Sequence, residues 1–281
     1  MDTKKKKLGI IAGGGTLPRR LIDYCIETKR DFFVLAIEGN AEKNLVDDTV
    51  PHLWIRLGQA GTGFKRFAEE KIEEVVMIGT IHRPSFKDLV PDLRTTAFFA
   101  KVSAKALGDD GLLRAVIKEI ESDKMRVVGI QEVMSDLLVK PGILGKHKPS
   151  KENMTDIIRG IKVAYELGRL DVGQSVIVQE GIVLGVEGIE GTDKLIKRCG
   201  EYKRKGSGGV LVKLRKPQQD MRIDLPTIGP RTLENAKASG LDGLAVHTGN
   251  TLIVDEEEVI KLADKLGLFI MGIEPGDYLE Q

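Results

Sequence analysis

Short apolar runs alternate with amphipathic segments over the first 130 residues. The runs at 8–12, 32–37, 75–78 and 126–130 have the length and composition of buried strands. Apolar side chains recur at helical spacing over 17–28, where Thr16 is the expected N-cap and Pro18 suits the first turn. We expect further helical segments at 63–71, 96–107 and 111–121. Strands that alternate with helices predict crossover units and a Rossmann-like, mostly parallel sheet.

The second half of the chain has a different pattern. Two apolar runs, 175–179 and 182–186, flank Glu180-Gly181 and predict a β-hairpin. Ser150 is the expected cap of a helix that runs to about Leu167 and ends at Gly168. The remaining expected elements are helices at 192–199, 232–239 and 256–266, and strands at 209–214, 244–246, 252–254 and 269–273. This order predicts a mixed α/β domain.

The two patterns meet in a segment with little regular periodicity. Pro141-Gly142, Gly145 and a basic, proline-ended run at 146–149 favour a linker or loop. We therefore predict a Rossmann-like N-terminal domain at 1–131, a linker at 132–150 and a C-terminal α/β domain at 151–281. A length of 281 residues suits two domains.

Composition excludes several classes of protein. A formal net charge of +1 argues against a dedicated nucleic-acid binder. Two distant cysteines, Cys25 and Cys199, favour buried, reduced thiols and a cytoplasmic location. No run reaches the ~18 apolar residues of a membrane span, which leaves only contact with a membrane surface open.

A glycine-rich loop is the first candidate binding segment. Gly13, Gly14, Gly15 and Thr16 stand between a strand and a helix, where backbone N–H groups can approach a phosphate. Glu38, at the end of the second strand, could accept from a ribose hydroxyl, as in nicotinamide-dependent oxidoreductases. Pro18 occupies the position of the third glycine of the G-x-G-x-x-G motif of those enzymes. A tight turn without a ligand is the competing interpretation.

Two acidic segments are further candidates. Asp109 belongs to a pair of aspartates before a helix, which could cap it, hold a cation or contact substrate. Glu187, Glu190 and Asp193 surround Thr192 at the start of another helix. Their oxygens suit Mg²⁺ or Mn²⁺, while Thr192 and neighbouring N–H groups could instead receive a phosphate. Local capping explains either segment equally well.

The stretch from residue 213 to 232 has the most informative chemistry. Lys213, Lys216 and Arg222 can neutralise a diphosphate. Asp220 and Asp224 can hold a cation or orient water. Its three prolines lower the entropic cost of ordering these groups. Gln219 and Thr227, in the same stretch, are expected substrate contacts.

Four motifs in this order resemble the LpxI-type UDP-2,3-diacylglucosamine diphosphatases of bacterial lipid A synthesis. They are LGIIAGGGTLP from residue 8, GDDGLLR from 108, EGIEGTD from 187 and KPQQDMRIDLPTIG from 216. The resemblance covers nearly the whole chain, and the last motif is the most specific. It implies metal-dependent hydrolysis of a lipid-linked nucleotide sugar to UMP and 2,3-diacylglucosamine 1-phosphate, by two α/β domains that hold the lipid sugar between them.

The resemblance also implies the roles of individual residues. The essential aspartate of the family corresponds to Asp224, in the pattern Arg-x-Asp-x-Pro, and Asp220 is a second carry-over. We expect Asp224 to ligate Mg²⁺ or Mn²⁺ and Lys213 or Arg222 to contact the diphosphate. A nicotinamide-dependent oxidoreductase and a non-catalytic protein that binds a nucleotide or lipid sugar are the alternatives. A location in the cytoplasm, with peripheral contact at the inner membrane, would suit such a substrate, and the oligomeric state is not predicted.

Overall fold

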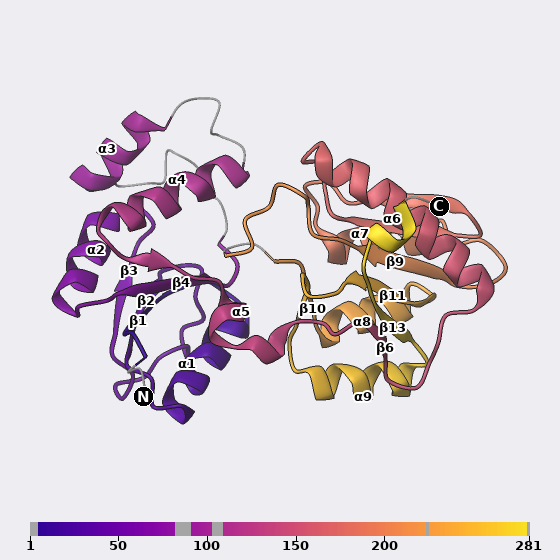
Figure 1. Ribbon diagram of the computed structural model, residues 1–281, viewed down its shortest axis with the longest axis horizontal. Coiled ribbons are helices and arrows are strands. Elements are labelled where there is room, and N and C mark those ends of the chain that lie inside the picture. The colour runs from indigo at the N-terminus through magenta and orange to yellow at the C-terminus, as the bar shows by residue number, and fades with distance from the viewer. Residues whose placement is uncertain (1–4, 82–90, 103–108, 223–224, 280–281) are drawn as a thin grey trace. The chain divides into compact units, whose positions relative to one another are not determined.

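A computed structural model describes residues 5–81, 91–102, 109–222 and 225–279 of the chain (Figure 1). The chain divides into two compact units. Unit 1 comprises Met1–Ser135 and Asp220–Ile223, and unit 2 comprises Asp136–Gln219 and Asp224–Gln281. The short segment Asp220–Ile223 therefore belongs to unit 1, although its neighbours in sequence belong to unit 2.

Unit 1 contains a five-stranded, all-parallel sheet, which confirms the Rossmann-like prediction. Its strand order is β3-β2-β1-β4-β5, so the direction of strand addition reverses between β1 and β4. The strands are β1 Leu8–Ala12, β2 Phe32–Ile37, β3 His52–Ile55, β4 Glu74–Ile78 and β5 Arg126–Val127. Every residue of β2 is buried, as expected for a strand covered on both faces.

Helices cover both faces of this sheet (Figure 1). α1 (Leu17–Glu27) lies on one face, whereas α2 (Ala60–Glu69) and α4 (Asp109–Ser122) pack on the other around Phe33 and Phe67. The remaining helices of the unit are α3 (Leu93–Lys101) and the short α5 (Ile130–Val133), which is followed by a 3-10 turn at Ser135–Leu137.

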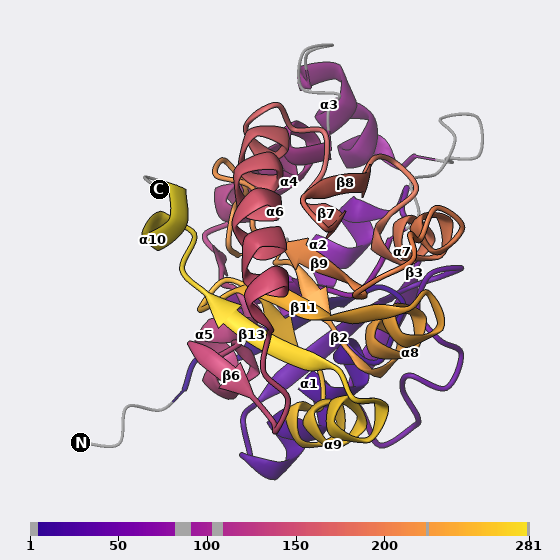
Figure 2. The ribbon, with the colours of Figure 1, turned by 90° about the vertical axis from the view of Figure 1, so that its right-hand side faces the viewer.

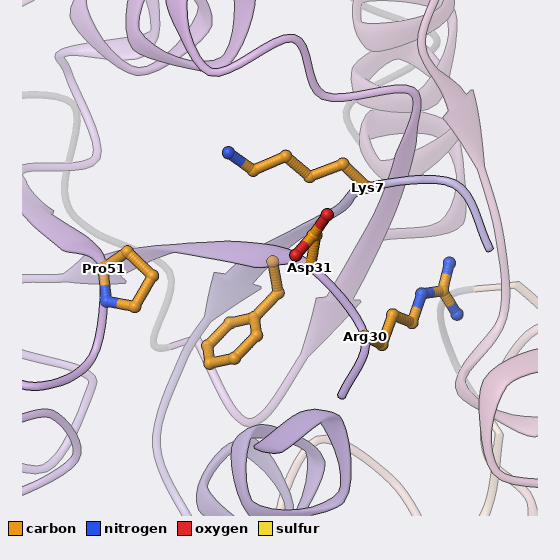
Figure 3. Close-up of a pocket in the computed structure, with 5 residues that line it drawn as sticks. Lys7, Arg30, Asp31 and Pro51 are labelled. Carbon is orange, nitrogen blue, oxygen red and sulfur yellow. The ribbon is translucent and has the colours of Figure 1, made fainter. Parts of the chain in front are cut away.

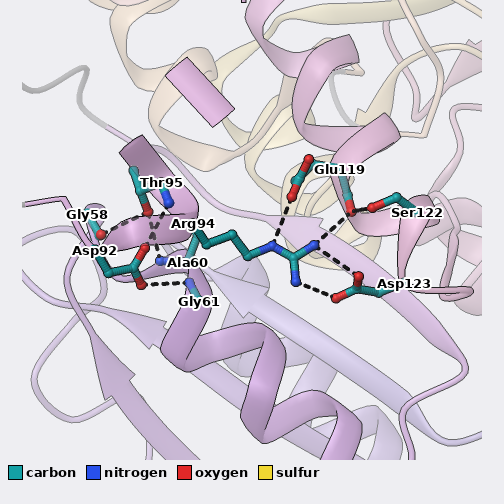
Figure 4. A network of polar contacts seen from close by, with 9 residues as sticks. All are labelled: Gly58, Ala60, Gly61, Asp92, Arg94, Thr95, Glu119, Ser122 and Asp123. Atoms are coloured by element: carbon teal, nitrogen blue, oxygen red, sulfur yellow. Dashed lines mark hydrogen bonds and ion pairs between the residues drawn. The ribbon is translucent and has the colours of Figure 1, made fainter. Parts of the chain in front are cut away.

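Helix α3 begins at Leu93, earlier than the predicted position 96, because Asp92 caps it. Its carboxylate accepts from Thr95 N at 2.8 Å and from Gly61 N at 2.7 Å (Figure 4). Burial opposes ionisation, but these hydrogen bonds outweigh it and hold the pKa of Asp92 below its usual value. Arg94 then ties α3 to α4, donating to Glu119 at 2.8 Å and to Asp123 at 2.6 Å.

Unit 2 contains a six-stranded mixed sheet in the order β6-β13-β11-β9-β7-β8, which confirms the predicted mixed α/β architecture. β9, β11 and β13 are parallel, while β6 and β7 run antiparallel to their neighbours at either side. The strands are β6 Gly142–Leu144, β7 Ser175–Gln179, β8 Ile182–Val186, β9 Gly209–Lys213, β11 Leu241–His247 and β13 Phe269–Ile273. Two short strands, β10 (Thr227–Ile228) and β12 (Leu252–Ile253), pair separately.

The hairpin between β7 and β8 is confirmed. Glu180 and Gly181 have φ of 52° and 77°, so both turn residues adopt the left-handed conformation of a type I′ turn. Strand β6, by contrast, lies within 132–150, where the sequence predicted no regular structure. It forms because Leu144 is buried against β13, a contact that local sequence does not reveal.

The helices of unit 2 also cover both faces of its sheet. α6 (Lys151–Arg169) crosses one face (Figure 2), and α7 (Thr192–Gly200), α8 (Pro230–Ala238) and α9 (Glu256–Leu266) cover the other. α10 (Gly276–Leu279) is a single turn near α6.

Ser150 caps α6 as predicted. Its hydroxyl accepts from Asn153 N at 3.1 Å, and Asn153 returns a side-chain bond to Ser150 N at 2.9 Å. The helix continues through Gly168, however, and ends at Arg169, so the prediction that Gly168 terminates it was wrong. Gly168 is buried against Lys216 and Pro217, and lies where tertiary packing favours a small residue.

Both cysteines are buried and unbridged, as predicted. Burial raises the pKa of the Cys25 thiol to about 11, which leaves it protonated at neutral pH. Within the part of the chain that the structure describes, no helix is both long enough and apolar enough to cross a membrane.

Candidate functional site

The carboxyl ends of the parallel strands in unit 1 form the first candidate site. Open α/β sheets bind ligands at this edge, beside the reversal in strand order. The Gly13–Thr16 loop follows β1 and the Gly79-Thr80 turn follows β4, so both stand at that reversal. The predicted glycine loop is therefore located where a nucleotide site is expected.

Two of the three glycines pack against neighbouring backbone. Gly13 N donates to Ile78 O at 2.8 Å, and Gly14 N donates to Thr80 O at 2.8 Å. A Cβ on Gly13 would lie 2.5 Å from Thr80 O, and one on Gly14 would lie 2.7 Å from Asn40 O. These two glycines thus allow close approach of adjacent loops, which accounts for them without any ligand.

Gly15 and Thr16 are the part of the loop that can receive an anion. Gly15 has φ of 93°, and a Cβ there would meet no atom within 4 Å. Among the described residues, the backbone N–H groups of Gly15 and Thr16 donate no hydrogen bond. Thr16 occupies the N-cap position of α1, but its side chain makes no capping hydrogen bond, contrary to expectation. The prediction of phosphate contact narrows to these two residues.

A matched pair of glycine substitutions tests this division. Gly79 and Gly15 have nearly the same φ, 91° and 93°, but a Cβ at Gly79 would lie 2.6 Å from Gly14 O. We expect Gly79→Ala to lower the free energy of unfolding by about 1–3 kcal/mol more than Gly15→Ala does, because only Gly79 is crowded. Denaturant titration of both variants measures the difference. Equal losses would mean that crowding at the loop is unimportant.

A hollow of about 270 Å³ lies at the opposite, amino edge of the sheet (Figure 3). Lys7, Arg30, Asp31, Phe32 and Pro51 line it. Its cations are already neutralised, since Lys7 pairs with Glu70 and Arg30 with Glu74, each at 2.7 Å. This hollow is therefore explained by structural ion pairs.

Unit 2 contains the second candidate site, a buried polar network at one end of its sheet. Lys213, the last residue of β9, is only 6% exposed. Its Nζ donates to Thr192 Oγ1 at 3.0 Å and to Thr227 O at 3.1 Å. The structure thus brings together Lys213, Thr192 and Thr227, three predicted substrate contacts from separate segments.

Thr192 links this lysine to a buried carboxylate. Its hydroxyl donates to Glu187 Oε1 at 2.8 Å, and Ser175 Oγ lies 3.3 Å away. Glu187 is 7% exposed, and its Oε2 is buried with no hydrogen-bond partner among the described residues. Because the hydroxyl of Thr192 is occupied within the network, its backbone N–H is the group suited to an anion.

Sequence reasoning did not select Ser175 or His247, and it treated Glu187 only as one member of an acidic cluster. Ser175 and Glu187 join the network because antiparallel pairing brings the start of β7 beside the end of β8. His247 ends β11, where burial lowers its pKa and leaves Nδ1 without a described partner. A polar residue at the end of an apolar strand was the available signal.

The other acidic candidates of unit 2 have basic or amide partners. Glu190 pairs with Arg198 at 2.7 Å, a hydrogen bond that lowers the pKa of this carboxyl. Asp193 accepts from Arg231 at 3.0 Å and from Asn235 at 3.0 Å. Across the described ranges, no three His, Cys, Asp or Glu residues are grouped to hold a metal ion.

Asp220 and Arg222 form a tight local pair in unit 1. Asp220 Oδ1 accepts from the Arg222 backbone N and Nε, each at 3.0 Å, and Oδ2 accepts from an Arg222 terminal nitrogen at 2.7 Å. These bonds lower the pKa of Asp220 and raise that of Arg222. Arg222 also pairs with Glu121 at 2.9 Å, so its charge is largely neutralised.

Three predicted site residues remain. Gln219 is 4% exposed, and its Oε1 accepts from Lys216 N at 3.3 Å, which closes a turn in unit 2. Asp224 lies outside the described residues. Asp109 is the first residue of α4, but its side chain also lies outside the description.

Comparison with known proteins identifies relatives over both units. Residues 7–137 match the LpxI N-terminal domain, and residues 140–271 match the LpxI C-terminal domain. The UDP-2,3-diacylglucosamine pyrophosphatase LpxI of Caulobacter vibrioides is 40% identical over 277 residues. This alignment covers 96% of the present chain and 98% of that protein.

Proposed function

Because the chain belongs to the LpxI family, we propose that it hydrolyses the diphosphate of UDP-2,3-diacylglucosamine in lipid A synthesis. The products are UMP and 2,3-diacylglucosamine 1-phosphate. The observation that carries the proposal is 40% identity to a pyrophosphatase across nearly the full length of both chains. The same membership disfavours the alternatives of a nicotinamide-dependent oxidoreductase and a non-catalytic binding protein.

The buried network of unit 2 supports contact with the diphosphate. Lys213 supplies a positive charge at the start of α7, where the helix dipole is also positive. The N-cap residue, Gly191, has no side chain that could cap α7. Among the described residues, the backbone N–H groups of Thr192, Asp193 and Lys194 donate no hydrogen bond. A phosphate here would gain backbone donors and one cation from a single region.

We assign this task to Lys213 because of its place at the start of α7. Arg222 already pairs with Asp220 and Glu121, so a phosphate would have to compete with two carboxylates. Lys213 donates to the hydroxyl oxygen of Thr192 and to the carbonyl oxygen of Thr227. The positive charge of Lys213, at the start of α7, can offset the charge of a diphosphate.

The chemical step adds one water molecule across the diphosphate. The water oxygen bonds to one phosphorus, the bond from that phosphorus to the bridging oxygen breaks, and the bridging oxygen leaves with the other phosphate. Positive charge must offset the anionic oxygens before water can approach. Lys213 and the N–H groups of α7 are the groups of this chain that we assign to that role.

Our proposal includes a divalent cation, with Asp224 as its ligand. Asp220, Glu190 and Asp193 are committed to the partners given above, so the described carboxylates do not assemble a metal site by themselves. Asp224 is the ligand that the family resemblance indicates. A bound Mg²⁺ or Mn²⁺ would neutralise phosphate charge and activate water.

Incubation of the protein with UDP-2,3-diacylglucosamine tests the activity and its metal requirement. We expect release of UMP, its loss after EDTA treatment, and its recovery when excess Mg²⁺ or Mn²⁺ is added. UMP can be quantified by chromatography. Absence of UMP with either ion would contradict the proposed reaction, whereas full activity in EDTA would contradict only the metal requirement.

Because the substrate is linked to a lipid, our proposal includes peripheral contact of the protein with the cytoplasmic side of the inner membrane. Leu170 and Ile189 are exposed apolar side chains of unit 2, at 73% and 108%, and Leu93 of unit 1 is 92% exposed. Apolar side chains of this kind can enter the boundary between headgroups and acyl chains.

A further inference from the structure

One short segment of the most specific motif belongs to a different unit from its neighbours in sequence. Asp220–Ile223 is part of unit 1, whereas Gln219 before it and Asp224 after it are part of unit 2. The structure describes residues 220–222 of this stretch, which we call the inserted segment. Contacts within unit 1 therefore decide where the inserted segment lies.

Helix α4 holds the inserted segment through charges of alternating sign. Arg114 and Glu121 are seven residues apart on α4, so they lie on the same side of the helix, two turns apart. Arg222 donates to Asp220 at 2.7 Å and to Glu121 at 2.9 Å. The hydrogen bonds from Arg222 lower the pKa of Asp220, and the positive charge of Arg114 adds to this effect. Each charge of the inserted segment thus has an opposite charge on α4.

Gln131 holds the backbone of the inserted segment. It lies in the single turn α5, and its Nε2 donates to Met221 O at 3.0 Å. The side-chain amide folds over Gly129, where a Cβ would overlap it. This bond fixes the main chain, whereas the ion pair with α4 fixes a side chain. Consecutive residues of the inserted segment, Met221 and Arg222, are thus held by two different helices of unit 1.

These contacts act together, because each of them is weak when taken alone. The side chains of Arg222 and Glu121 are 35% and 40% exposed, and an ion pair that water reaches contributes little. A single neutral hydrogen bond, such as that from Gln131, is also modest. The position of the inserted segment therefore depends on both Glu121 and Gln131.

We infer that Glu121 and Gln131 are positioning residues for the hydrolysis, which hold the inserted segment and so the backbone that leads into Asp224. The inference rests on the proposed function, in which Asp224 holds the cation. Arg222 is then a tether of this backbone and not a contact of the diphosphate. A shift of about 1 Å in a reacting group can cost about 10²-fold in rate, so the loss of such a tether lowers kcat.

Steady-state release of UMP by the full-length protein tests the inference. Glu121→Gln and Gln131→Leu should each lower kcat by about 2- to 5-fold. The double variant should lower it by up to about 10²-fold, with KM little changed, because the groups that bind substrate remain. A folded double variant with the wild-type kcat would overturn the inference. So would a higher kcat/KM in Glu121→Gln, because freeing Arg222 would then improve contact with the substrate.

Limited digestion with trypsin measures the position of the inserted segment without any activity. Trypsin cleaves after arginine, and cleavage of a native protein follows the population of locally open forms. We expect cleavage after Arg222, identified by mass spectrometry, to be at least about 5-fold faster in the double variant than in the wild type. Cleavage at the wild-type rate would overturn the inference.

Glu119→Gln is the matched control for both measurements. Glu119 lies on the same helix and pairs with Arg94 at 2.8 Å, so the substitution removes an ion pair of the same kind (Figure 4). It should leave kcat and the rate of cleavage after Arg222 unchanged. If it reproduced both effects of Glu121→Gln, general loosening of α4 would explain them and the inference would fail.

These outcomes separate the inference from the proposed function. UMP release that is equal in the wild type and the double variant would remove the positioning role and keep the reaction. Absence of UMP release by the wild type would remove the proposed function. The rate of cleavage after Arg222 would still decide whether Glu121 and Gln131 hold the inserted segment.

Discussion

Replacement of Asp224 with alanine is expected to lower kcat by at least about 10²–10³-fold, the usual loss on removal of one preorganised charge-stabilising group. In the proposed mechanism, Asp224 of the Arg-x-Asp-x-Pro pattern holds the cation, as the family resemblance implies. Without it, the charge of the diphosphate is less well offset when water attacks, while the groups that bind the ground state remain. Steady-state release of UMP at saturating Mg²⁺ or Mn²⁺ measures the effect, and KM should change much less than kcat.

Asp220→Ala is the matched comparison for this experiment. Asp220 lies four positions earlier in the same segment, but both of its oxygens accept from Arg222. We therefore expect its loss to act mainly through the position of Arg222 and to cost less in kcat than the loss of Asp224. Circular dichroism of both variants checks folding. An unchanged kcat in folded Asp224→Ala would refute the proposed role of this aspartate.

Lys213→Met is expected to have the second largest effect, on both activity and stability. The substitution removes the cation that we assign to the diphosphate, which should lower kcat/KM by about 10²–10³-fold. It also leaves Glu187 buried without the charge to which Thr192 couples it. Lys213 and Glu187 share Thr192 rather than a direct contact, so we expect a cost of about 1–3 kcal/mol of folding free energy, the usual range for a buried polar group that loses its partner. Denaturant titration and UMP release measure the two effects.

A double substitution distinguishes catalysis from folding. Lys213→Met combined with Glu187→Gln removes both buried charges, so it should recover much of the lost stability. It should not recover activity, because the positive charge is still missing. Lys197→Met removes an exposed lysine from the last turn of the same helix, α7, and is the control for net charge. Recovery of both stability and activity in the double variant would show that Lys213 has only a structural role.

Local rules were sufficient for most of the helices and strands. The hairpin at Glu180-Gly181 was predictable because two apolar runs flank a two-residue loop. In the structure both loop residues adopt positive φ, as such a turn requires. Helix α9 has the predicted bounds, since Gly267 adopts the left-handed conformation that ends a helix. Local rules failed where tertiary contacts prevailed, as at Gly168, which continues a helix, and in β6, which pairs with a distant strand.

The sequence by itself determined the alternation of strands and helices, the change from a parallel to a mixed sheet, and the motifs of the family. Each depends on neighbours in sequence or on the order of side chains, which can be read without coordinates. Only the tertiary structure decided that the N–H groups of Gly13 and Gly14 donate to the backbone of a neighbouring segment. It likewise decided that Glu187, Thr192 and Lys213 share one buried network. Those outcomes depend on which strand ends meet and which polar atoms lose contact with water. Strand order and burial set both, and neither is written in any local segment.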